Sequence, residues 1–170
     1  MRQKIFLALG VVALFVFSFP VQAGQPRLLQ SYGDWDAYVF DEDGSKVCYM
    51  ASKPQRTEGS YARRGEVHAL VTHRPAESTK NVFSYITGYS YKAGSEASVE
   101  VDGVKFPLFT QDDTAWTPGA ESDETLAKAL RSGKVMIVRG VSSRGTATAD
   151  FFSLTGSTAA HERISKGGGY

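Results

Sequence analysis

The sequence contains very little cysteine: Cys48 is the only one among 170 residues. A lone cysteine cannot close a disulfide within its own chain, so packing must hold the fold together. Cys48 lies in the apolar stretch Val-Cys-Tyr-Met at residues 47–50, which favours a buried, inert thiol. The alternative is a free thiol that reacts or forms an intermolecular disulfide.

Long hydrophobic runs are absent except at the start of the chain. Residues 1–4 carry two positive charges, residues 5–20 are uncharged and mostly apolar, and Val-Gln-Ala at residues 21–23 fits a cleavage site. The run is shorter than the ~20 apolar residues of a typical membrane span, and no cysteine follows it to serve as a lipoprotein anchor. We predict a signal peptide over residues 1–23, with an uncleaved anchor as the alternative, and one β-rich envelope domain over residues 24–170.

Neither sign of charge is in excess. The chain has 19 lysines and arginines and 18 aspartates and glutamates. Removal of Arg2 and Lys4 with the signal peptide leaves 17 basic residues against 18 acidic ones, a formal net charge of −1. This balance argues against nucleic acid as a partner, and any charged partner must bind at a local patch.

The spacings that build catalytic, metal and phosphate sites are also absent. His68 and His73 lie five residues apart in a predicted strand and therefore point to opposite faces, which argues against a shared metal ion. The acidic turn at residues 41–44 lacks the later ligands of a calcium loop. The sequence has no Gly-x-Ser-x-Gly motif and no phosphate-binding glycine motif. We predict no catalytic residue, metal or cofactor, although a hydrolase site assembled by folding from Cys48 or a serine with a histidine stays open.

Turn residues separate short stretches with the two-residue alternation of β-strands. The Asp-Gly pair at residues 102–103 can adopt the positive φ angles of a type I′ hairpin turn, and Pro107, which has no N–H, indicates an edge strand. The pattern predicts a mainly β fold, an antiparallel β-sandwich or partly closed barrel with one or two short helices. The predicted strands cover residues 35–40, 46–52, 66–74, 82–91, 98–101, 104–106, 135–138 (a central strand) and 146–154.

Two helices are expected near the end of the chain. The first covers residues 122–131, with Ser122 or Asp123 as its N-cap. A short second helix is expected over residues 157–164. The glycine-rich end, residues 166–170, is expected to be a flexible tail.

A basic loop over residues 53–65 is the first candidate for binding. Such a cluster can bind an acidic glycan, an acidic protein or anionic lipid in peripheral contact with a membrane, although a solvated basic loop needs no ligand. The four basic side chains of this loop are Lys53, Arg56, Arg63 and Arg64.

We expect that neutralising its three arginines together leaves the melting temperature nearly unchanged and weakens the association with outer-membrane or host-surface material.

An aromatic stripe is the second candidate. Phe83, Tyr85, Tyr89 and Tyr91 share one face of the predicted strand over residues 82–91. Four aromatic residues on one strand face are more often part of a core than a recognition surface. An exposed stripe would favour a chaperone-like or assembly factor.

Three short elements resemble the invasion-associated locus B family. They are Tyr-Gly-Asp-Trp at residues 32–35, Val-Cys-Tyr-Met at residues 47–50 and Phe-Ser-Leu-Thr-Gly-Ser-Thr-Ala-Ala at residues 152–160. The resemblance implies a β-rich Gram-negative envelope protein without known catalysis, from a family linked to host-cell entry. Family members often carry further cysteines soon after the Gly-Asp-Trp element and near the C-terminus, where this chain has none, and Ser157 stands where a phenylalanine is usual.

The leading hypothesis is therefore a non-enzymatic periplasmic or outer-membrane-associated or secreted protein that binds an envelope or host-surface protein or glycan. An envelope chaperone-like or assembly factor is the alternative. A hydrolase is the third and least favoured class.

Overall fold

The computed structural model describes residues 24–170, so the predicted signal peptide lies outside the described residues and the division of the chain into signal and single domain stays a prediction. No helix within residues 24–170 is both long and apolar enough to cross a membrane. The strands are β1 (Arg27–Tyr32), β2 (Trp35–Glu42), β3 (Ser45–Ser52), β4 (Arg56–Glu58), β5 (His68–Arg74), β6 (Thr79–Ile86), β7 (Ala97–Val101), β8 (Val104–Gln111), β9 (Thr114–Trp116), β10 (Val135–Val141) and β11 (Ala147–Ser153). The helices are α1 (Ala120–Ser132), α2 (Ser157–Gly168) and a short 3-10 helix, η1 (Pro75–Glu77).

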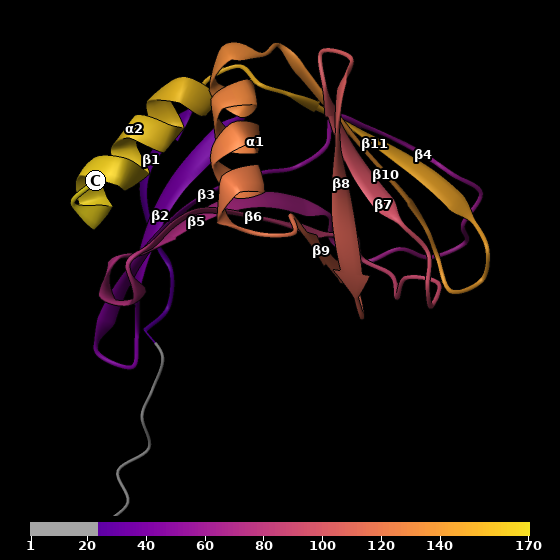
Figure 1. Cartoon of the computed structure of the whole chain (residues 1–170), viewed down its shortest axis with the longest axis horizontal. Coiled ribbons are helices and arrows are strands. Elements are labelled where there is room, and N and C mark those ends of the chain that lie inside the picture. Colours follow the sequence, from indigo (N-terminus) through magenta and orange to yellow (C-terminus); the bar gives the residue numbers. More distant parts are fainter. Residues whose placement is uncertain (1–23) are drawn as a thin grey trace, which may run out of the picture.

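The strands form one open, antiparallel sheet that bends at β8. Their order is β1-β2-β3-β5-β6-β9-β8-β7-β10-β11-β4, and it does not return to its first strand within the described residues. Residues 104–108 of β8 pair with β7, whereas residues 109–111 pair with β9, so β8 belongs to both halves of the sheet. The bend brings the two halves face to face (Figure 1). The predicted mainly β, sandwich-like fold is confirmed.

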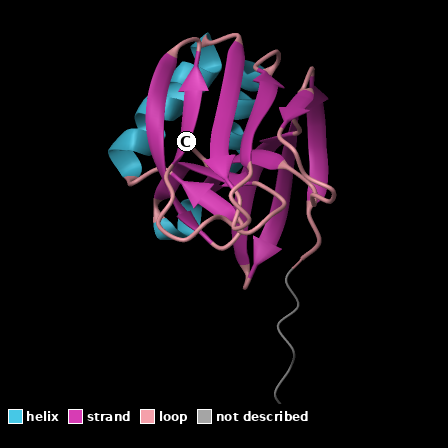
Figure 2. Cartoon of the chain, turned by 90° about the vertical axis from the view of Figure 1, so that its right-hand side faces the viewer, coloured by secondary structure: helices cyan, strands magenta, loops and turns pink. Residues whose placement is uncertain are grey.

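Both helices lie on the same side of the first half of the sheet, which is formed by β1, β2, β3, β5, β6 and β9, as Figure 2 shows. Helix α1 packs on β6 and α2 packs on β2, β3 and β5. The other half of the sheet covers the rest of this inner face, where the ring of Phe152 on β11 meets Tyr85 on β6 at 6.3 Å between ring centroids. Burial of Leu126, Leu130 and Ile164 from the helices completes one continuous core.

Two hairpins follow the predicted turn chemistry. The Asp43-Gly44 and Asp102-Gly103 pairs have positive φ at both residues, as a type I′ turn requires. Strand β10 lies between β7 and β11, as expected for a central strand. Strand β8 as a whole is not an edge strand, because it pairs with both β7 and β9. At Pro107, however, its partner is β7 alone, since β9 pairs only with residues 109–111. The position of Pro107 is therefore locally an edge, and the missing N–H removes no bond to β9.

The ends of the helices differ from the prediction. Neither Ser122 nor Asp123 caps α1, which begins after Gly119 without a side-chain cap. Asp123 is buried and accepts hydrogen bonds from the Phe83 backbone N–H, at 2.8 Å, and from the Thr117 hydroxyl, so it fastens α1 to β6. Burial raises the pKa of its carboxyl group.

The C-terminal tail is also ordered, contrary to expectation. Helix α2 continues to Gly168, four residues beyond the predicted end. The hydroxyl of Tyr170 then donates a hydrogen bond to the Thr79 carbonyl at 3.1 Å, and its ring lies 5.3 Å from that of His73. These contacts hold the end of the chain against β5 and β6.

Two of the sequence elements that carry the family resemblance pack against each other. The Asp34 backbone N–H donates to the Thr155 carbonyl, and the Trp35 indole N–H donates to the Ser153 carbonyl, each at 3.0 Å. A Cβ atom on Gly156 would lie 1.8 Å from the Tyr32 carbonyl oxygen. Only glycine fits this approach, so the two elements close the fold between β1 and α2.

We predict that Gly156→Ala destabilises the protein far more than Gly145→Ala. Both glycines have positive φ, 90° and 84°, but a Cβ on Gly145 meets nothing within 4 Å. The control should lose about 1–2 kcal/mol from backbone strain alone, and Gly156→Ala a further ~1–3 kcal/mol because the backbone must move. Urea unfolding of the mature chain measures the difference, and equal losses would contradict the packing role.

Candidate functional site

The basic loop is anchored by an arginine that lies inside the protein. The Arg64 side chain is 5% exposed and donates two hydrogen bonds, at 2.7 and 2.6 Å, to the carboxylate of Asp150 on β11, which is fully buried. It also donates to the Thr87 carbonyl at 2.7 Å. This position corrects the expectation that Arg64 belongs to an exposed patch: the inward-facing Asp150 needs a countercharge, and Arg64 supplies it. Neutralising Arg64 together with Arg56 and Arg63 should therefore lower the melting temperature, contrary to the expectation from the sequence.

The hydroxyl of Tyr85 completes this buried cluster by donating to the same carboxylate. Burial opposes the charge of Arg64, but its hydrogen bonds to Asp150 raise its pKa further above the physiological range. Burial and then the charge of Asp150 raise the pKa of Tyr85. Both groups therefore keep their protons, and the cluster is a fixed ion pair with a neutral donor.

Three loops enclose a cavity of about 470 Å³ beside this cluster. The Gly65 backbone N–H donates to the Gly88 carbonyl at 2.8 Å, which joins the basic loop to the segment after β6. Gly88 has a φ of 73°, and a Cβ there would lie 2.5 Å from the Gly65 carbonyl oxygen. The Ser143 N–H donates to the Ser90 carbonyl at 2.7 Å, which adds the turn between β10 and β11 as the third wall.

Among the residues that the structure describes, the cavity wall combines hydroxyl groups, two tyrosines and two arginines, with no acidic side chain. Arg63 and Arg144 are exposed and form no ion pair within residues 24–170. The Arg64 guanidinium carbon lies 5.3 Å from the ring centroid of Tyr61 and 5.1 Å from that of Tyr89, so it supports both rings. The hydroxyl groups belong to Ser60, Ser90, Ser142, Ser143, Thr146 and Thr148.

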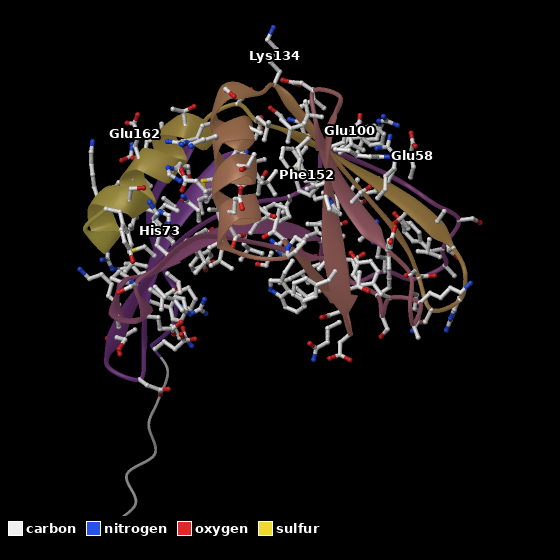
Figure 3. All side chains as sticks on the ribbon, viewed as in Figure 1. Glu58, His73, Glu100, Lys134, Phe152 and Glu162 are labelled. Atoms are coloured by element: carbon white, nitrogen blue, oxygen red, sulfur yellow. The ribbon has the colours of Figure 1, made fainter. Side chains whose placement is uncertain are left out.

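The four basic residues of the predicted patch are not brought together. Lys53 pairs with Glu66 at 2.6 Å, away from the cavity. Arg56 pairs with Glu58 and lies 3.5 Å above the ring of Phe151, on the outer strand β4, where Figure 3 labels Glu58. Only Arg63 reaches the cavity, and binding by any of the four stays a prediction.

The predicted aromatic stripe divides into core and cavity wall. Strand β6 ends at Ile86, so the alternation does not continue to residue 91. Phe83, Tyr85 and Tyr91 are buried in the core. Tyr89 is half-buried, donates to or accepts from the Thr148 hydroxyl at 2.6 Å, and lines the cavity.

A second polar cluster lies between β5 and α2. His68 and His73 point to opposite faces of β5, as predicted, and the inward-facing His73 meets His161 of α2 at 5.4 Å between ring centroids (Figure 3). The Asn81 backbone N–H donates to His73 Nδ1 at 3.0 Å, so the proton of this neutral ring is on Nε2, 3.2 Å from the Ser165 hydroxyl. The sequence pattern does not single out His161: this residue lies in the helix predicted over residues 157–164, but Ser165, four residues on, falls just beyond the predicted end.

The comparisons with known proteins concern most of the chain. The sequence model of the family described as invasion associated locus B (IalB) protein matches residues 35–165. The chain belongs to the invasion associated locus B family. The crystal structure of invasion associated protein b from Bartonella henselae has a similar fold, with a TM-score of 0.59, 18% sequence identity, and coverage of 83% of this chain and 98% of that one. No curated protein sequence matches the chain.

The hydrolase alternative requires a serine close to a histidine. In this locus B protein Ser165 lies beside His73 and His161, in a groove of about 350 Å³. His73 donates its Nε2 proton toward Ser165, so it cannot accept the hydroxyl proton in this tautomer. His161 Nδ1 lies 3.5 Å from the same hydroxyl, and burial lowers the His161 pKa to about 4, which makes it a weak base. The arrangement therefore favours a structural hydrogen-bond chain that attaches α2.

The thiol of Cys48 is not accessible as a nucleophile in this locus B protein. It is buried under the end of α2, where a Cβ on Gly167 would lie 3.0 Å from its Sγ. Burial raises the pKa of the thiol, which disfavours the reactive thiolate. Within residues 24–170, no group of three or more His, Cys, Asp or Glu side chains is arranged to hold a metal ion.

We predict that Arg64→Gln lowers the unfolding free energy by about 3–5 kcal/mol, because it leaves Asp150 buried without a countercharge. Arg63→Gln, one residue away and exposed, should change it by less than ~0.5 kcal/mol. The double variant Arg64→Gln/Asp150→Asn should recover part of the loss. Urea unfolding measures all three, and equal effects of the two single changes would contradict the assignment.

We also predict that stability falls as the pH drops from 7 to 5. Burial lowers the pKa of both His73 and His161 to about 4, from an ordinary value of 6.5. Between these values the unfolded chain binds more protons than the folded one, so acid favours unfolding by at most ~1.4 kcal/mol per pH unit for each histidine. Urea unfolding across this range should show a slope that the His73→Gln/His161→Gln variant largely removes; an unchanged slope would exclude this cause.

Proposed function

We propose that this locus B protein is exported to the periplasm or outer surface of a Gram-negative cell, where it binds an anionic partner without catalysis. The observation that carries the proposal is the cavity between the basic loop and the β10–β11 turn. Its two arginines, Arg63 and Arg144, are exposed, and no acidic side chain from the described part of the chain, residues 24–170, lines it. Export is supported by the apolar N-terminal run of the sequence.

The local charge matters because the exported chain has almost no net charge. A protein with a formal charge near −1 does not attract anions as a whole. Acids on the strands that adjoin these loops do not oppose its arginines: Asp150 on β11 is neutralised by Arg64, and Glu58 on β4 by Arg56. Arg63 and Arg144 therefore bring uncompensated positive charge to the place where the loops converge.

A role at a host surface extends this proposal. The similar solved structure is named invasion associated protein b, and the present chain shares its family. Acidic groups on either the bacterial envelope or a host surface would suit the same cavity. A binding experiment with envelope material and a second one with host-surface material distinguish these two partners.

An assembly factor is a second candidate. The aromatic surface that favours it is not the predicted stripe within residues 82–91 but another set of rings. On the sheet face opposite the helices, Tyr38 stacks on Tyr49 at 5.0 Å and Phe109 stacks on Trp116 at 5.5 Å. Phe109 is 51% exposed. Such stacked, partly exposed rings could bind an apolar segment of another envelope protein.

We predict that Arg63→Gln/Arg144→Gln weakens capture of the mature chain by solubilised envelope membranes or host-cell surface material at least tenfold. Each lost charge-assisted hydrogen bond costs about 1.5–3 kcal/mol. The matched control is Lys53→Gln/Arg56→Gln, which removes the same charge from residues already paired with acids. The measurement is the fraction captured at several protein concentrations.

Equal weakening by both double variants would mean that net charge, rather than the cavity, drives capture. Capture that survives both changes and is lost in Phe109→Ser would favour the assembly factor. Either result would overturn the anionic-partner proposal.

A further inference from the structure

We propose that the cavity binds a carboxylated saccharide, with the carboxylate on the arginines and the sugar ring against the tyrosines and hydroxyl groups. This inference rests on the proposed anionic partner and names its chemistry. Three features of the cavity lead to it: its size, its unused hydroxyl groups and the separation of charge from ring contacts.

The size fits a small ligand. A volume of about 470 Å³ lies within the range of small-molecule sites, which is roughly 300–1,000 Å³. Hydrogen bonds between backbone groups of the three loops, at 2.7 and 2.8 Å, fix the walls before any ligand arrives. A preformed cavity loses little entropy on binding, which suits a compact, polar ligand such as a sugar.

The hydroxyl groups favour a sugar over a simple anion. The side-chain hydroxyls of Ser90 and Ser143 make no hydrogen bond with the protein within residues 24–170, whereas that of Thr148 pairs with Tyr89. A serine hydroxyl both donates and accepts, and so does each hydroxyl of a sugar. A fully ionised anion only accepts hydrogen bonds, so it would leave the acceptor capacity of these serine hydroxyls unused.

The tyrosines supply a surface for the C–H face of a sugar ring. Tyr61 is 37% exposed and Tyr89 is half-buried, and both lie within 5.3 Å of the buried Arg64 guanidinium. Tyr61 is further fixed by a 2.7 Å hydrogen bond between its hydroxyl and that of Thr57. Rigid aromatic rings of this kind bury apolar area at a low entropic cost.

The arginines then select a carboxylate. Arg63 comes from the basic loop and Arg144 from the β10–β11 turn, so they approach the cavity from two walls. A guanidinium group binds a carboxylate through two parallel N–H···O bonds. A neutral sugar would forgo these contacts, and inorganic phosphate would forgo those with the rings.

The experiment is calorimetric titration of the mature chain with galacturonate, glucuronate and N-acetylneuraminate, alongside galactose and inorganic phosphate. We expect at least one acidic sugar to bind at least tenfold more tightly than galactose and phosphate. Arg144→Gln should weaken that binding at least tenfold, and Tyr61→Leu should weaken the sugar but not phosphate. Lys53→Gln is the matched control and should change neither.

Three results would overturn the inference. Phosphate binding as tight as that of the best sugar would indicate a plain anion site, and equal binding of galactose would remove the role of the charge. Absence of binding by all three acidic sugars at millimolar concentration would exclude a saccharide. None of these results alters the capture experiment with envelope or host material, so failure here is separable from failure of the anionic-partner proposal.

Discussion

The buried carboxylate of Asp150 is the constraint on which the rest of the site depends. An unpaired charge between two sheet halves is costly, and a buried pair is broken only at a loss of several kcal/mol. Arg64 supplies the countercharge from a connection 86 residues earlier in the sequence, and it also donates to Thr87. This pair therefore fixes the path of the loop between β4 and β5, and the cavity exists because that loop cannot move away from β6 and β11.

Local patterns predict the framework well. Two-residue alternation locates most of the long strands, the Asp-Gly pairs locate two hairpin turns, and the helices follow from their apolar spacing. Each of these features is decided by neighbours in the sequence, through backbone preferences and the face that each side chain takes. The bend at β8 and the ordered Tyr170 depend instead on distant contacts, and no local pattern indicates them.

The site is predicted less well for the same reason. Arg63 and Arg64 are equivalent in sequence, yet one is exposed and the other is buried because of Asp150. The sequence does carry a signal: Asp150 and Phe152 share a face of the strand predicted over residues 146–154, so an acidic residue lies on the same face as an aromatic one. Pairing that acid with one particular arginine requires the tertiary structure. His161 is similar, since only the docking of α2 on β5 brings it to His73.

The sequence elements that carry the family resemblance explain the fold but not the cavity. The elements around Gly33 and Gly156 close the fold through backbone hydrogen bonds and a contact too close for any Cβ. They lie apart from the cavity, so the resemblance that they carry concerns the fold and does not require a shared ligand. The cavity instead depends on which charges remain unpaired. Of the basic side chains in the loop, three are matched by Glu66, Glu58 and Asp150, so the loop's unpaired charge is that of Arg63. A nearly neutral protein thus acquires a positive site through the arrangement of its ion pairs rather than through its composition.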